Sequence, residues 1–251
     1  MRNFKPLSAY IVLVLLVTPA ATQAQSKRPE VSIEQRQVIE SVIEDYLLRN
    51  PIIIRQAINA LRAKEENTKK ARISEALKTH KQQIFRDETS PVGGNPKGDI
   101  TLVEFFDYNC GYCKKAATTL KAVVEKDPNI RVVYKEFAIL GPESATAARA
   151  ALAAHRQGKY IEFHEGLMAE EANESNILAL VKSLGMDYSR FRKDMGRSDI
   201  EAILQKNYQL ANILGITGTP VFVIGDQIIP GAVSEEALQR AIKEERRRLK
   251  N

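Results

Sequence analysis

The stretch Phe-Phe-Asp-Tyr-Asn-Cys-Gly-Tyr-Cys-Lys-Lys, residues 105–115, decides the fold of this chain. It contains Cys110 and Cys113, the only two cysteines among 251 residues. The apolar run 101–106 predicts a buried strand before the pair, and the pattern of 114–126 predicts a helix after it. A Cys-x-x-Cys pair at a strand-to-helix turn is typical of a redox-active dithiol.

The two cysteines are expected to have different tasks. Only a thiolate attacks a disulfide, so the attacking cysteine needs a lowered pKa. Asn109 is a good N-cap residue, which predicts that Cys110 lies in the first helical turn, where the helix dipole stabilises negative charge. Cys113, one turn later, should point inward. We expect Cys110 to attack substrates and Cys113 to resolve the mixed disulfide, so that the pair alternates between a dithiol and a redox-active disulfide.

A metal site is the main alternative for the cysteine pair. Structural zinc needs four ligands. The chain adds only three histidines, none in a paired motif: His80, His155 and His164. We therefore expect no metal and no other cofactor, and the histidines receive no role. A pair of inert buried thiols is a second alternative.

The first 24 residues have the features of a secretory signal peptide. Arg2 and Lys5 precede an apolar stretch, 7–17, that is shorter than the roughly 20 residues needed to span a bilayer. Small residues around Ala24 suit a cleavage site. A retained membrane anchor is the alternative. An exported chain usually forms structural disulfides, but cysteines three apart close a ring too small to stabilise a fold much.

The net charge argues against nucleic-acid binding. Lys and Arg number 37 against 31 Asp and Glu, a formal charge of +6. The basic run 246–248 near the C-terminus has no interleaved aromatic residues, which nucleic-acid recognition would favour. We interpret this run as a solvated helix end and expect no nucleic-acid partner.

Residues 25–90 are expected to form a helical oligomerisation segment and stalk. Ser32 and Gln35 fit a capping box, and Asn50-Pro51 should separate two amphipathic helices. These helices are rich in isoleucine and are too short to bury their apolar faces on each other, so copies of themselves are the simplest partner. The segment 62–87 is polar and helix-like. The alternative is that 31–88 packs on the main domain as a decoration.

Residues 91–251 are expected to form an α/β domain. A loop over 90–98 should lead to a strand at 101–106, and a second strand is predicted at 131–137. A helical insertion follows at about 142–213, and a hairpin and a final helix are predicted last, at 221–229 and 235–249.

Three further positions are candidates for the site. Glu104 shares a strand face with two apolar residues, so its pKa should be raised and it could relay protons to Cys113. Lys135 is either its ionic partner or a snorkelling lysine. A cis Thr219-Pro220 bond would leave the backbone of Thr219 free to pair with a substrate strand. Frequency alone favours a trans bond.

Taken together, these motifs resemble the DsbA-like thioredoxin family of bacterial envelope thiol-disulfide oxidoreductases. The similarity rests on residues 105–114, on Tyr-Lys-Glu-Phe at 134–137 and on Gly-Thr-Pro at 218–220. With the N-terminal extension, the chain is most similar to the ScsC and Com1-type members. The resemblance implies a thioredoxin fold with an inserted helical subdomain, roles for Cys110 and Cys113, a buried acid at Glu104 and a cis Pro220.

The resemblance also suggests the direction of the chemistry. The Gly111-Tyr112 dipeptide matches the motif of the disulfide isomerase DsbC and lacks the Pro-His of the strongly oxidising DsbA, which implies a less oxidising centre. We expect Gly111, Tyr112, Thr219 and Pro220 to contact substrate. An involvement of copper is implied by the resemblance alone.

Three functions remain open at this point. The first is a periplasmic disulfide isomerase or reductase that acts on exported proteins, assembles as a dimer or trimer and uses a membrane thiol redox partner. The second is a monomeric dithiol oxidase. The third is a non-catalytic chaperone or surface-antigen module.

Overall fold

The computed structural model describes residues 31–250, so the expected signal peptide lies outside the described residues. The chain divides after Leu61 into two compact units, which are described separately. Among the described residues, no helix is both long and apolar enough to cross a membrane.

The first unit contains α1 (Ile33–Arg49) and the first part of α2 (Pro51–Thr79). The predicted capping box is present: Gln35 N donates to Ser32 Oγ at 3.2 Å, and Ser32 N donates to Gln35 Oε1 at 3.0 Å. Asn50 ends α1 and Pro51 begins α2, as the Asn-Pro pair predicts. The predicted second amphipathic helix and most of the predicted polar segment 62–87 form one helix of 29 residues, which ends at Thr79.

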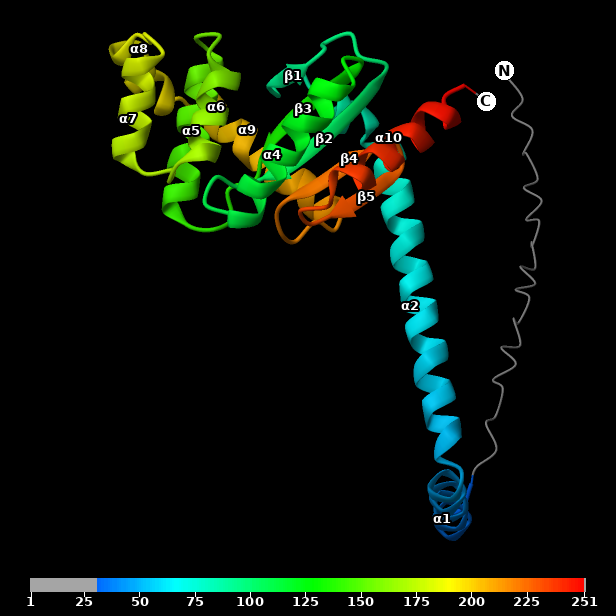
Figure 1. Cartoon of the computed structure of the whole chain (residues 1–251). Coiled ribbons are helices and arrows are strands. Elements are labelled where there is room, and N and C mark those ends of the chain that lie inside the picture. Colours follow the sequence, from blue (N-terminus) through cyan, green and yellow to red (C-terminus); the bar gives the residue numbers. More distant parts are fainter. Residues whose placement is uncertain (1–30, 251) are drawn as a thin grey trace, which may run out of the picture. The chain divides into compact units, whose positions relative to one another are not determined.

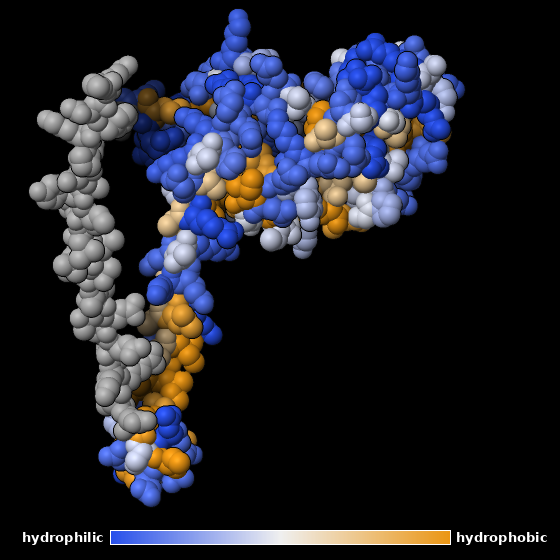
Figure 2. Space-filling view, turned by 180° about the vertical axis from the view of Figure 1, so that it is seen from behind, coloured by the Kyte–Doolittle hydropathy of each residue, from blue (hydrophilic) through white to orange (hydrophobic). Residues whose placement is uncertain are grey.

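The apolar side chains of this unit are exposed. No residue of α1 is buried, and Val42 and Ile43 are 62% and 52% exposed. Figure 2 shows apolar surface on the first part of α2 and further apolar side chains on α1. Soluble proteins seldom leave so many large apolar side chains together in water. The exposed set comprises Ile33, Val38, Ile39, Val42, Ile43, Tyr46, Leu48, Ile52, Ile54, Ile58 and Leu61.

The second unit is built on a five-stranded mixed sheet with the order β1-β3-β2-β4-β5 (Figure 1). Strand β2 is central, parallel to β3 and antiparallel to β4. Its seven residues are almost all buried, which explains the continuous apolar run in the sequence. The strands are β1 (Val92–Gly94), β2 (Ile100–Phe106), β3 (Ile130–Glu136), β4 (Val221–Ile224) and β5 (Gln227–Pro230).

Helices cover both faces of this sheet. On one face, α4 (Gly111–Lys126) and α10 (Glu235–Arg248) pack against Leu102 and Val132. On the other face, the end of α2, α3 (Lys81–Phe85) and the end of α9 (Ser198–Ile213) pack against Val103 and Val133. The second half of α2 therefore joins the core of this unit.

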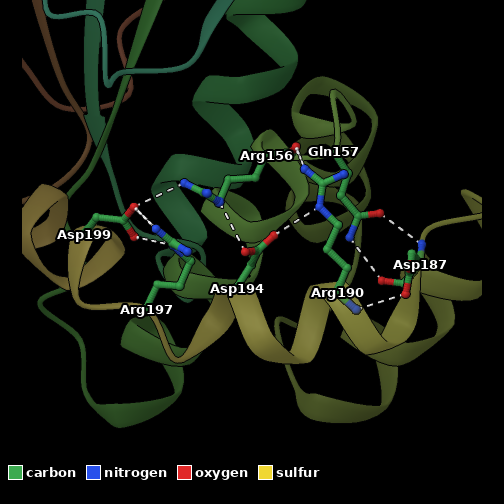
Figure 3. A network of polar contacts seen from close by, with 7 residues as sticks. All are labelled: Arg156, Gln157, Asp187, Arg190, Asp194, Arg197 and Asp199. Atoms are coloured by element: carbon green, nitrogen blue, oxygen red, sulfur yellow. Dashed lines mark hydrogen bonds and ion pairs between the residues drawn. The ribbon is translucent and has the colours of Figure 1, made fainter.

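Five helices stand between β3 and β4 and form the helical subdomain: α5 (Pro142–His155), α6 (Tyr160–Ala169), α7 (Glu174–Ser183), α8 (Tyr188–Met195) and α9. Buried alanines of α5 let the neighbouring helices approach closely. At the C-terminal end of α5, Arg156 lies 3.2 Å from both Asp194 and Asp199, so it connects α5 to α8 and α9 (Figure 3). Asp194 is buried, and Arg190 supplies a second cation to it at 3.6 Å.

Candidate active site

The dithiol lies where β2 passes into α4. Cys110 is itself the N-cap residue of α4, and its Sγ accepts a hydrogen bond from Cys113 N at 3.3 Å. The prediction of Asn109 as the N-cap was therefore wrong by one residue. Asn109 instead faces α5, where its Nδ2 donates to Ser144 Oγ at 3.1 Å. As the N-cap, the Cys110 sulfur contacts a free N–H group of the first turn directly.

The two thiols are unpaired and differ in accessibility. Cys110 is 7% exposed and Cys113 is fully buried. Burial raises the pKa of the Cys113 thiol well above its usual value. Cys113 therefore needs a base to become a nucleophile, whereas the Cys110 sulfur is the one that a large substrate can reach.

The loop before β4 completes the surroundings of Cys110. The Thr219-Pro220 peptide bond is cis, as the resemblance implied and against the trans form that frequency alone favours. The Cys110 thiol donates to the Thr219 carbonyl, with 3.4 Å between sulfur and oxygen. On the other side of Cys110, Tyr112 is 72% exposed, and a side chain at Gly111 would meet only open space. The structure thus brings six of the predicted site residues together: Cys110, Gly111, Tyr112, Cys113, Thr219 and Pro220.

Glu104 lies in β2 on the sheet face that carries α4. It is fully buried, and neither carboxyl oxygen has a hydrogen-bond partner among residues 31–250. Burial raises the pKa of this carboxyl to about 8. A carboxyl group with this pKa populates both its neutral and its charged form within the physiological pH range, which suits proton transfer.

Lys135 does not pair with Glu104 and does not snorkel. It is fully buried, and in the register of the sheet it lies opposite Phe105, on the other face from Glu104. Its Nζ lies 3.2 Å from Asp87 Oδ2 and donates to Ser90 Oγ at 2.7 Å. The prediction was wrong because the buried partners come from a segment about 45 residues upstream, which the local sequence does not reveal.

Asp107, which the sequence did not single out, holds the turn in place. Its buried carboxylate accepts four hydrogen bonds, and two of them reach Oδ1 from within the site: one from Asn109 N at 2.8 Å and one from Ser144 Oγ at 2.7 Å. Its Oδ2 accepts from the backbone N–H groups of Ile139 and Leu140 at 2.8 and 3.0 Å. One side chain thus fixes the turn before Cys110 to the loop after β3 and to α5.

A second buried acid lies beside this turn. Glu136 Oε1 accepts hydrogen bonds from the hydroxyls of Tyr108 and Tyr160, at 3.1 and 2.8 Å. The Tyr108 hydroxyl also lies 3.0 Å from His164 Nδ1. Burial raises the pKa of Glu136 to about 8 and lowers that of His164 to about 3. Sequence reasoning missed this group because its members lie on β3, on α6 and in the turn, although the strand alternation that singled out Glu104 places Glu136 on the same face.

No group of three or more potential metal ligands gathers among residues 31–250. Within residues 31–250, none of the three histidines, His80, His155 and His164, forms a hydrogen bond with Cys110 or Cys113. Of the three, only His164 is buried in a polar network.

A dithiol at a strand-to-helix turn, facing a cis-proline loop on a mixed sheet, defines a thiol-disulfide oxidoreductase with the thioredoxin fold. The chain belongs to the DSBA-like thioredoxin domain family, which it matches over residues 101–243. Residues 35–67 also match the N-terminal domain of the copper resistance protein ScsC. The predicted family and fold class are therefore confirmed.

Solved structures agree with this assignment. A thioredoxin-like oxidoreductase from Silicibacter pomeroyi is 45% identical, with a TM-score of 0.64 over 66% of this chain and 97% of that one. Proteus mirabilis ScsC in a compact conformation is 32% identical, with a TM-score of 0.65 over 86% of this chain and 100% of that one. A periplasmic thioredoxin-like protein from Salmonella enterica is 33% identical, with a TM-score of 0.60 over 65% and 94%.

Curated relatives include much longer proteins. The Na(+)/H(+) antiporter NhaA 1 of Salinispora arenicola is 28% identical over 155 residues, which are 60% of this chain and 24% of that protein. The chain thus spans about a quarter of the length of the first such relatives.

Proposed function

We propose that this protein is a periplasmic disulfide isomerase and reductase that acts on the cysteines of exported proteins. The observation that carries the proposal is the combination of an unpaired dithiol at the N-terminus of α4 with an exposed apolar surface on α1 and α2. The first feature supplies thiol exchange. The exposed apolar surface would let copies of the chain associate. The expected dimer or trimer would hold several dithiols in one assembly.

Catalysis begins at Cys110. Its thiolate attacks one sulfur of a substrate disulfide, so that a Cys110–substrate disulfide forms and a substrate thiolate leaves. In isomerisation, a substrate thiolate then forms a new disulfide within the substrate and releases the Cys110 thiolate. In reduction, the Cys113 thiolate attacks Cys110 Sγ, which releases the second substrate thiolate and leaves the Cys110–Cys113 disulfide.

Other residues of the site support these steps. Glu104 is proposed to accept the proton of Cys113, since its ionised form is available near neutral pH and it lies buried on the same sheet face as α4. Thr219 and Pro220 are proposed to hold the substrate backbone near Cys110, and Gly111 and Tyr112 to contact its side chains. The thiol contact at Thr219 and the exposure of Tyr112 support these roles.

The location and the partners follow from the same reasoning. A signal peptide at 1–24 would export the chain, and its similarity to a periplasmic protein supports that compartment. An isomerase must keep Cys110 reduced in an oxidising compartment. We therefore include a membrane thiol redox partner in the proposal, which returns electrons to the dithiol after each reductive turnover.

Refolding of scrambled ribonuclease A tests the proposed function. The purified protein should restore ribonuclease activity, Cys110→Ala should abolish the effect, and Cys113→Ala should retain isomerisation but trap mixed disulfides. Activity on reduced ribonuclease with none on scrambled ribonuclease would indicate a dithiol oxidase. Full activity of Cys110→Ala would indicate a non-catalytic chaperone.

A further inference from the structure

A cavity of about 410 Å³ lies between α4 and α6, outside the dithiol site. These two helices pack against each other, and Gly94 of β1 and Tyr134 of β3 complete the lining (Figure 1). The volume falls within the range of small-molecule sites, about 300–1,000 Å³. The proposed thiol chemistry does not use this space.

The walls and the mouth of the cavity favour an uncharged ligand with an apolar body. Most of the wall is apolar, formed by Ala117, Leu120, Val124, Ile161 and Met168. The charged lining residues are two cations and two acids, so the mouth carries no net charge: Lys114, Lys121, Glu125 and Glu165. Lys121 and Glu165 pair with each other at 3.2 Å.

Two polar groups of the lining lack hydrogen-bond partners. His164 is only 4% exposed, and its Nδ1 is occupied by the Tyr108 hydroxyl, whereas its Nε2 has no partner among residues 31–250. The Tyr134 hydroxyl likewise has none within the described part of the chain. The Nε2 atom is not among the fully enclosed unsatisfied atoms of residues 31–250, so it is open to the cavity, where a ligand can bond to it.

The chemistry of these two groups selects the ligand. The rings of Tyr134 and His164 lie 4.6 Å apart between centroids, so both rings line the same part of the cavity. Burial keeps His164 neutral by lowering its pKa to about 3. A ligand hydroxyl can therefore form a hydrogen bond with the free ring nitrogen of this neutral imidazole. The rings and the Met168 thioether also favour an aromatic body.

We propose that the cavity between α4 and α6 binds an uncharged phenol or aromatic alcohol, with its hydroxyl on His164 Nε2 and its ring among the apolar walls. The proposal is independent of the redox chemistry, since the binding involves no thiol step.

Binding of 4-methylphenol and of toluene to the purified protein tests this site, because the two probes differ only in the hydroxyl. Titration calorimetry or ligand-observed NMR should show saturable binding, roughly tenfold tighter for 4-methylphenol, as about 1.4 kcal/mol of hydrogen bonding provides. His164→Phe should reduce the ratio of the two affinities to about one.

Filling the cavity supplies an independent check. Ala117→Phe should weaken both probes at least tenfold, since the new ring would occupy the apolar space. Glu162→Phe, on an exposed position of α6 that does not line the cavity, is the matched control and should bind both probes as the unchanged protein does. Absence of saturable binding, equal affinity for the two probes, or unchanged binding in Ala117→Phe would each overturn the proposal.

Discussion

Asp107 shows how one residue can organise an active-site turn without contacting substrate. Its carboxylate accepts from the turn itself, from α5 and from the loop after β3. Each carboxyl oxygen of Asp107 accepts hydrogen bonds from two donors. The position therefore requires a side chain whose polar atoms are all hydrogen-bond acceptors. An amide at this position would direct its own N–H groups at existing donors.

Asp107→Asn should therefore destabilise the protein by about 2–4 kcal/mol, the cost of losing charge-assisted bonds at a buried group. Urea denaturation followed by circular dichroism measures this change. Asp226→Asn, in an exposed turn, is the control and should stay within about 0.5 kcal/mol of the unchanged protein. Equal midpoints for both variants would show that the hydrogen bonds of Asp107 contribute little.

Glu104 should affect the rate of disulfide formation. If it accepts the Cys113 proton, Glu104→Gln should slow closure of the Cys110–Cys113 disulfide at least tenfold, a modest share of general-base catalysis. The rate should also lose its dependence on an ionisation near pH 8. Stopped-flow mixing with oxidised glutathione from pH 6 to 9 measures both effects, with the exposed Glu88→Gln as the control. An unchanged pH profile would remove Glu104 from the mechanism.

Glu104 should also make the free energy of unfolding depend on pH, and its raised pKa determines the direction of that dependence. The folded pKa of about 8 lies above the unfolded value of 4.5, so the folded protein holds this proton over a range in which the unfolded chain has released it. The free energy of unfolding should fall between those two pH values. Glu104→Gln removes this loss and should gain stability relative to the unchanged protein by roughly 3 kcal/mol at pH 7 and by little at pH 4.5. Chemical denaturation at both pH values is the measurement.

The sequence revealed the site residues whose chemistry is local. Cys110, Cys113 and Pro220 belong to short motifs, and the alternation of β2 indicated that Glu104 is buried. The Asp107–Ser144 and Tyr108–His164 contacts join residues 37 and 56 positions apart. Such pairs depend on how the helical subdomain packs, and a single sequence carries no record of that packing.

Elements with a strong periodic pattern were also predictable. The capped start of α1, its end at Asn50 and the β4–β5 hairpin follow from rules that act within a few residues. Strand β1 was missed because Val92-Gly93-Gly94 has the composition of a loop. It is a strand because it pairs with β3, where a side chain on Gly93 would approach the Tyr134 ring at 2.9 Å.

The turn of the β4–β5 hairpin provides a test at this scale. Gly225 has a φ of +58°, and a Cβ there would overlap the Glu245 carboxylate. Gly158 has a similar φ of +70° but faces open space. Gly158→Ala should cost about 1 kcal/mol from backbone strain alone, and Gly225→Ala should cost up to about 1 kcal/mol more because the Glu245 carboxylate must move from its place beside Arg248. Thermal unfolding of the two variants measures the difference, and equal losses would show that the Glu245 side chain moves without cost.

At the scale of the whole molecule, the exposed apolar residues of α1 and α2 predict self-association. Val42→Asp places a charge among them and should raise the dissociation constant of the oligomer at least about hundredfold, since burying an unpaired charge costs several kcal/mol. Sedimentation velocity measures the mass. Ser41→Asp adds the same charge beside the apolar set and should leave the mass unchanged. A monomer at all concentrations before any substitution would contradict the proposed assembly.

Val42→Asp also tests whether disulfide isomerisation depends on assembly of the oligomer. If assembly is needed for isomerisation, Val42→Asp should lose most activity on scrambled ribonuclease while its dithiol still reacts with oxidised glutathione at the normal rate. Retention of full isomerase activity in a monomer would place the whole function in the second unit.

The division of labour around Cys110 has a practical consequence for protein engineering. The hydrogen bonds that fix the turn come from Asp107, upstream of the helix, whereas Gly111 and Tyr112 project into open space and take no part in them. The dipeptide can therefore be replaced without loss of the hydrogen bonds that fix the turn. A library of variants randomised at Gly111 and Tyr112 would therefore contain proteins with the same fold and different reduction potentials. Both oxidising and reducing catalysts could be selected from it.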